Sequence, residues 1–194
     1  MVVGIVVAAV AALLVVGAAI GGGQVKKGTA TALTPAATRS AAATATPAPG
    51  FTDPTNHFSA SFRDAPVEDS NSLSVAGHPV SEVLWSDAID VSTAEIVGYA
   101  TYPASFNFSA PNAALNGAVA GEVSNVHGTL LSKTFGVYQG FHSVDAVISA
   151  QQVFIESRAI LAGQTVYIVI TTSAHNPPEL FAGFAPTLTI LTHS

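Results

Sequence analysis

The sequence predicts an α+β domain in which an antiparallel sheet of about six to eight strands carries helices packed mainly on one face. Residues 153–172 contain two strand-like runs joined by a turn, which predicts a hairpin. Most of the chain from Phe51 onward has the same period of two, and this changes to a helical period at residues 112–124 and 178–184. Many strands with few helices are typical of a layered α+β domain.

The hairpin at residues 153–172 organises this prediction. Its turn lies at 162–164, and either two-residue loop, Ala162-Gly163 or Gly163-Gln164, gives the same two faces. One face carries Glu156, Arg158, Ile160, Tyr167 and Val169. The other carries Val153, Ile155, Ser157, Ala159, Val166, Ile168 and Ile170. Because Ser157 is the only polar member of the second set, we expect that face to belong to the core, with Ile168 fully buried.

The other elements are separated by polar or proline-containing turns. Strands are expected at residues 58–62, 71–76, 80–88, 95–102, 130–138 and 187–191, and residues 143–160 are long enough for one bent strand or two. The helix at 112–124 has one apolar face, made of Leu115, Ala118, Val119 and Val123. Its expected N-cap is Ser109 or Asn112, and residues 178–184 form the second, shorter helix.

Composition and charge exclude several classes of function. Only 9% of the residues are charged, against roughly 25% in typical soluble proteins. From Phe51 onward, three basic residues stand against all 12 acidic ones, a net charge of −9. A domain of this charge has no electrostatic footprint for nucleic acid, so no nucleic-acid partner is expected. The absence of cysteine excludes disulfides, thiolate nucleophiles and Cys-ligated metal centres.

The first 50 residues predict a membrane anchor followed by a linker. Residues 2–20 are all apolar or glycine, and as a helix they would be about 28 Å long, close to the roughly 30 Å hydrocarbon core of a bilayer. We therefore expect residues 1–23 to be a transmembrane helix, with a signal peptide as the alternative. Residues 24–50 are rich in Ala, Thr and Pro and predict a disordered linker. The folded domain is then 51–194.

The orientation of the anchor rests on two opposing signals. Lys26 and Lys27 follow the apolar run and favour a cytoplasmic position for that end by the positive-inside rule. The Ala/Thr/Pro-rich linker instead resembles the extracytoplasmic stalks of bacterial envelope proteins. We expect a single-pass protein of the cell membrane with its domain outside the cytoplasm.

Several short motifs occur in an order that resembles a known family. They are Phe58 and Phe62 followed by Pro66, Tyr102-Pro103, the helical residues Leu115, Gly117 and Ala118, Gly140-Phe141, Arg158 followed by Gly163 and Tyr167, and Phe181 with Phe184. In this order they resemble the small PsbP/Mog1-like domains of bacterial membrane-anchored or secreted proteins, although Arg63 stands where that pattern usually has proline. The resemblance implies the PsbP/Mog1-like fold and a scaffold or ligand-binding role, and it implies no catalytic residue.

The sequence contains no motif that builds a catalytic or metal site. The six histidines lack the spacings that place two ligands on one helix or strand face. His142, Ser143 and Asp145 have the residue types of a hydrolase triad, but three near neighbours on one strand cannot converge. The acidic residues of the segment 64–69 lack the spacing of a calcium loop and are expected to be solvated. We expect no metal ion and no cofactor.

Arg158 is the one candidate binding residue, because it is the only basic residue of the hairpin. It is expected near Glu156 and Tyr167 on the mixed face of the hairpin. The interpretation that we favour is a structural ion pair or a hydrogen-bonded arginine on the sheet. In the other interpretation Arg158, Glu156 and Tyr167 form an anchor for an anionic ligand or partner. Trp85 lies in the middle of a strand and is expected in the core.

The sequence favours a non-enzymatic, membrane-tethered extracytoplasmic domain for binding or protein interaction at the cell envelope. Its partners would be the membrane, through the N-terminal helix, and a protein or small molecule. One alternative is an envelope hydrolase whose site is assembled only in the fold, and another is an accessory subunit of a membrane complex. A deep pocket with convergent polar side chains would favour the enzyme, and a shallow apolar groove or a paired sheet edge would favour binding.

Overall fold

The structure is a computed structural model that describes residues 50–191 except 56, 76, 152, 176 and 177. The expected anchor at 1–23 and nearly all of the expected linker at 24–50 lie outside the described residues, so both stay predictions. Within the described ranges, no helix is long and apolar enough to cross a membrane.

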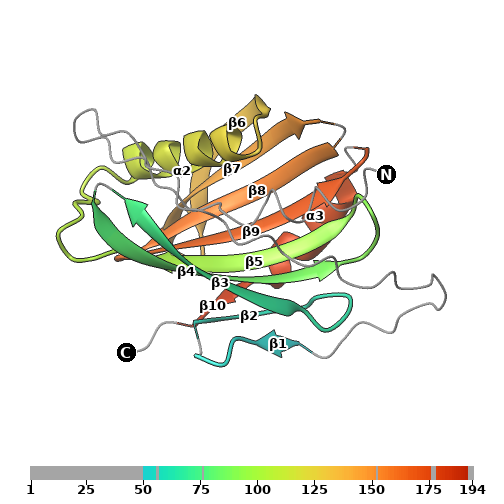
Figure 1. Cartoon of the computed structure of the whole chain (residues 1–194), viewed down its shortest axis with the longest axis horizontal. Helices are drawn as coiled ribbons and strands as arrows, with labels where there is room; N and C mark the ends of the chain where they lie inside the picture. The colour runs from blue at the N-terminus through green and yellow to red at the C-terminus, as the bar shows by residue number, and fades with distance from the viewer. Residues whose placement is uncertain (1–49, 56, 76, 152, 176–177, 192–194) are drawn as a thin grey trace.

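The described residues form two antiparallel sheets, two α-helices and a 3₁₀ turn (Figure 1). In chain order the elements are β1 (Phe51–Thr52), β2 (Phe58–Ala60), β3 (Val67–Val75), β4 (His78–Ala88), β5 (Ala94–Thr101), α2 (Pro111–Asn125), β6 (Thr129–Tyr138), β7 (Phe141–Ala150), β8 (Val153–Ala162), β9 (Thr165–Ser173), α3 (Pro178–Phe184), the 3₁₀ turn η1 (Ala185–Thr187) and β10 (Thr189–Ile190). The main sheet has seven strands in the order β3-β4-β5-β9-β8-β7-β6. The small sheet has three, in the order β1-β2-β10.

The predicted hairpin is confirmed in detail. β8 and β9 are joined by Gly163 and Gln164, so that Arg158 lies opposite Val169, and Ile160 opposite Tyr167. Gly163 has a φ of 62°, a left-handed conformation that glycine adopts at no steric cost. Ile168 is 1% exposed, as expected for the apolar face of the hairpin.

The α+β class and the antiparallel sheet are confirmed, but the expectation of helices mainly on one face is wrong. α2 packs against β6, β7 and β8 on one face of the main sheet. α3 and the small sheet cover the other face, where their residues share a second core with Trp85, Val97, Ile160, Tyr167 and Val169 (Figure 1). Since this mixed face of β8 and β9 also carries large apolar side chains, these require their own cover. Burial of Trp85 in this second core is confirmed.

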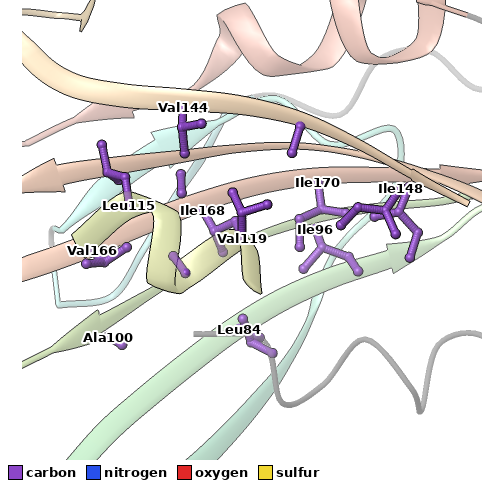
Figure 2. Packing of buried hydrophobic residues seen from close by; sticks show 14 of the residues in the cluster. Leu84, Ile96, Ala100, Leu115, Val119, Val144, Ile148, Val166, Ile168 and Ile170 are labelled. Carbon is purple, nitrogen blue, oxygen red and sulfur yellow. The ribbon is translucent and has the colours of Figure 1, made fainter. Parts of the chain in front are cut away.

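The first core lies between α2 and the main sheet (Figure 2). Leu115 and Val119 of α2 are buried together with Val144, Ile148 and Ile168 of the sheet. Side chains from elements that are far apart in the sequence meet in this core. For example, β5 pairs with β9, so that Ala94 lies opposite Thr172.

Other differences from the expected elements lie at strand and helix ends. The expected strands at 58–62 and 187–191 are shorter, as β2 and β10, and belong to the small sheet. β3 begins at Val67, four residues before the expected start. The expected N-cap of the first helix is wrong: Ala110 takes that position without a side-chain hydrogen bond, and Pro111 begins the helix. Proline suits this position because it lacks an N–H that would otherwise have no partner.

Candidate binding site at the β6 edge

A cleft of about 140 Å³ lies at the β6 end of the main sheet. Its lining residues are Thr134, Phe135, Gly136, Val137 and Tyr138 of β6, Ser143 and Asp145 of β7, and Arg158 of β8. The strand register places Thr134, Asp145 and Arg158 in one row across the three strands, on the sheet face opposite α2. The cleft is smaller than the roughly 300–1,000 Å³ of typical small-molecule sites.

Arg158 and Asp145, which both line this cleft, form an ion pair. The Arg158 Nε lies 2.6 Å from Asp145 Oδ1, and the Arg158 Nη2 lies 2.7 Å from Oδ2. This is the two-pronged geometry in which a guanidinium binds a carboxylate most strongly. The hydrogen bonds to Asp145 raise the pKa of Arg158, and its partial burial opposes that shift. The two charges thus neutralise each other.

Two aromatic rings complete the surroundings of Arg158. Its guanidinium carbon lies 4.8 Å from the ring centroid of Tyr138 and 5.7 Å from that of Phe181 in α3. The Tyr138 hydroxyl donates to the carbonyl oxygen of Leu188 at 2.7 Å, which ties the end of β6 to the chain after η1. From its position on β8, Arg158 therefore contacts side chains of β6, β7 and α3.

The three predicted site residues share one face of the hairpin, but Arg158 is paired with a residue outside this set. Arg158, which was expected near Glu156, has an ion pair on the mixed face, and its partner is Asp145 of β7. Asp145 lies directly opposite Arg158 on β7, whereas Glu156 is two residues away on the same strand. The pKa of Glu156 is raised by its burial and by the nearby charge of Glu179. Tyr167 is buried in the second core, with its ring centroid 6.1 Å from that of Tyr99.

The residues of the expected non-functional triad lie where the sequence placed them, on one strand. Ser143 and Asp145 share the cleft face of β7, and His142 belongs to the opposite face by the alternation of the strand. Asp145 is bound by Arg158. Among the described residues, no group of three or more His, Asp or Glu side chains is arranged to hold a metal ion.

The exposure of β6 was not expected from the sequence. β6 forms one edge of the main sheet, and nine of its ten residues are exposed. Four of the six large hydrophobic residues that are exposed in the described part of the chain belong to it: Leu130, Leu131, Phe135 and Val137. Lys133, the only charged residue of β6, lies 5.6 Å from the ring centroid of Phe135 and donates a hydrogen bond to Asn116 of α2.

A buried carboxyl group was also missed. Glu122 of α2 lies inside the first core, where its Oε2 accepts a hydrogen bond of 2.8 Å from the Ser157 hydroxyl. Its Oε1 has no hydrogen-bond partner among the described residues. Burial raises the pKa of Glu122 to about 7, and the hydrogen bond from Ser157 opposes the shift. Ser157 is one of the few polar residues on the core face of the hairpin, and it indicates the position of this partner.

Comparison with known proteins shows which solved structure has a similar fold. No family model matches the sequence, and no curated protein matches it. The solution structure of cyanobacterial PsbP (CyanoP) from Synechocystis sp. PCC 6803 does match, with a TM-score of 0.51 over 81% of this chain and 99% of that chain. This chain has a PsbP-like fold. The identity between the two is 10%, so the likeness concerns the fold alone. The β6 edge of this PsbP-like domain must be interpreted from its own residues.

Proposed function

We propose that this chain is a membrane-tethered extracytoplasmic domain that binds a partner at the cell envelope and acts without catalysis. In this proposal residues 1–23 hold the chain in the cell membrane, and residues 24–50 are the linker that carries the PsbP-like domain away from the bilayer. The apolar run and the Ala/Thr/Pro-rich segment support the tether.

The observation that supports binding is the long exposed edge strand β6 with its apolar side chains. An edge strand presents a row of unpaired backbone N–H and C=O groups, to which an extended segment of another chain can add as a further strand. Backbone hydrogen bonds then supply affinity, and exposed side chains such as Phe135 and Val137 supply apolar contact. The cleft beside β6 would receive side chains of the added strand.

The chemistry of the cleft also favours binding over hydrolysis. A hydrolase of the triad type needs a carboxylate that orients a histidine, which in turn activates the nucleophile. Here the carboxylate of Asp145 is bound by Arg158, and His142 belongs to the other face of the sheet. Neither His142 nor Asp145, the two candidate partners on the same strand, can therefore activate Ser143.

The proposal is tested by photo-crosslinking of the full-length chain in the cells that produce it. A photoreactive residue replaces Val137 on β6 or, as the matched control, Val67 on β3; both are edge-strand valines with 69% exposed side chains. We expect the chain to stay in the membrane pellet after an alkaline carbonate wash and to form a discrete adduct from position 137 only. Release by carbonate would contradict the tether, and equal adducts or none at the two positions would contradict binding at β6.

A further inference from the structure

The two edges of the main sheet differ in charge. β3 carries Glu68 and Asp69 together with several polar residues, and charged side chains are one of the devices by which natural sheets prevent edge-to-edge pairing. β6 has no acidic residue and a single basic one, Lys133. The protection found on β3 is therefore nearly absent on β6.

The negative charge of the domain makes one sheet edge more favourable than the other for contact between two copies of this chain. With a net charge of −9 from Phe51 onward, two copies repel each other over most of their surfaces. Pairing through β3 would place Glu68 and Asp69 of each copy within the contact and so bring four acidic side chains into it. Pairing through β6 brings no acidic residue of that strand to the contact, and Asp145 in the adjacent row is neutralised by Arg158.

The sequence of β6 is also compatible with pairing to itself. A bulge lies between Leu130 and Ser132, and residues 132–138 then pair regularly with β7. An antiparallel pair of these seven-residue segments has its two-fold axis at Phe135. Phe135 then faces its counterpart, and Lys133 of each copy faces Val137 of the other. The two lysines are about 13 Å apart along the strands, beyond the distance at which exposed charges repel strongly in physiological salt.

We propose that β6 pairs antiparallel with β6 of a second copy of this chain, about a two-fold axis at Phe135, so that two seven-stranded sheets become continuous. The pair buries Phe135 and Val137 of both copies and satisfies the free backbone groups of residues 132–138 on both edges. This inference rests on the proposed function in one respect, since both use β6. Attachment of both copies to one membrane would raise their effective concentration and so strengthen a contact of this limited size.

Because the chain has no cysteine, single introduced cysteines can report the register. In the purified full-length chain, Phe135→Cys places two sulfur atoms across the axis, where the Cβ atoms of directly opposite residues are about 4.5–5.5 Å apart. We expect mild oxidation to give a disulfide-linked dimer from Phe135→Cys. We expect none from Val137→Cys, whose counterpart lies about four residues away along the strand, or from Val67→Cys on β3. A Phe135→Cys chain that stays monomeric, or that dimerises no faster than Val67→Cys, would overturn the proposal.

A charge pair added at an exposed position tests the same register independently. In the Phe135→Cys background, Val137→Lys sets a second lysine against Lys133 of the other copy, and Val137→Glu sets an opposite charge there. We expect the glutamate variant to dimerise about tenfold more readily than the lysine variant, because each substitution acts at two symmetric positions. Equal dimerisation would overturn the register. If position 137 captures a different protein in cells while Phe135→Cys stays monomeric, binding at β6 stands and the second copy is excluded.

Discussion

Replacing Ile168 by alanine is expected to lower the free energy of unfolding by about 2–5 kcal/mol. Ile168 is buried at the centre of the first core, in the region covered by Val119 of α2 (Figure 2). Its neighbours on the adjacent strands are Ala159 and Gly98, which have almost no side chain with which to fill the vacated space. The cavity should therefore persist, and the cost should lie toward the upper end of this range.

Denaturant unfolding of the full-length chain in detergent measures this effect. Val137→Ala, which removes apolar atoms from an exposed edge position, is the control and should change stability by less than about 0.5 kcal/mol. Arg158→Ala should be intermediate, at about 1–3 kcal/mol, since it removes the bidentate ion pair with Asp145 and the contacts with two aromatic rings. Equal stabilities for Ile168→Ala and Val137→Ala would show that the Ile168 side chain is not buried in the first core.

The stability of the protein should fall as the pH rises through the range in which Glu122 ionises. The pKa of this carboxyl is raised from 4.5 to about 7 in the folded state, because the charged form loses its hydration inside the core. The folded protein therefore holds the proton more tightly than the unfolded chain. The stabilisation is complete below pH 4.5, is lost progressively up to about pH 7, and amounts to about 3 kcal/mol by the linkage relation.

Glu122→Gln separates this contribution from that of the other carboxyl groups. Glutamine keeps an acceptor for the Ser157 hydroxyl but cannot ionise. The variant should lose most of the decline in melting temperature between pH 5 and pH 8 that the wild type shows, and the slope that remains would reflect groups such as Glu95 and Glu156, whose pKa values are also raised. If the melting temperatures of wild type and variant changed in parallel with pH, the Glu122 carboxyl would be hydrated and its pKa would not be raised.

The parts of the fold that the sequence predicts best are those set by local patterns. The hairpin of β8 and β9 is an example, because alternation and Gly163 determine its faces without reference to any other element. The helix α2 is another, and its extent was predicted to within one residue at each end. Its N-cap was not, because Pro111 begins this helix without the side-chain hydrogen bond on which the capping prediction depends.

The partner of Arg158 was missed because residues 143–160 were left open as one strand or two. β7 and β8 are joined at 151–152, where Gln151 adopts a positive φ of 56° without being a glycine that would mark the turn. Once that turn is known, counting residues outward from it along both strands, as for β8 and β9, places Asp145 opposite Arg158. The small sheet was missed for a different reason, since two-residue strands such as β1 and β10 carry no periodic signal.

The exposure of β6 could not be derived from its own residues. Leu130, Leu131, Phe135 and Val137 would suit a central strand equally well. Their exposure follows from the strand order, in which β9 inserts between β5 and β8 and leaves β6 at the end. Such long-range pairing has no local signal in a single sequence.

Hydrogen exchange at the two sheet edges, measured in the full-length chain within the membranes of the cells that make it, tests binding at β6 most directly. Edge-strand amides that face solvent exchange quickly, whereas amides bonded to an added strand are protected. The solvent-facing amides among residues 132–138 should exchange about tenfold or more slowly in the membranes than in the chain diluted into detergent, and the solvent-facing amides of β3 should exchange equally in both. Equally fast exchange of β6 in the two conditions would contradict the claim that this edge is a binding surface.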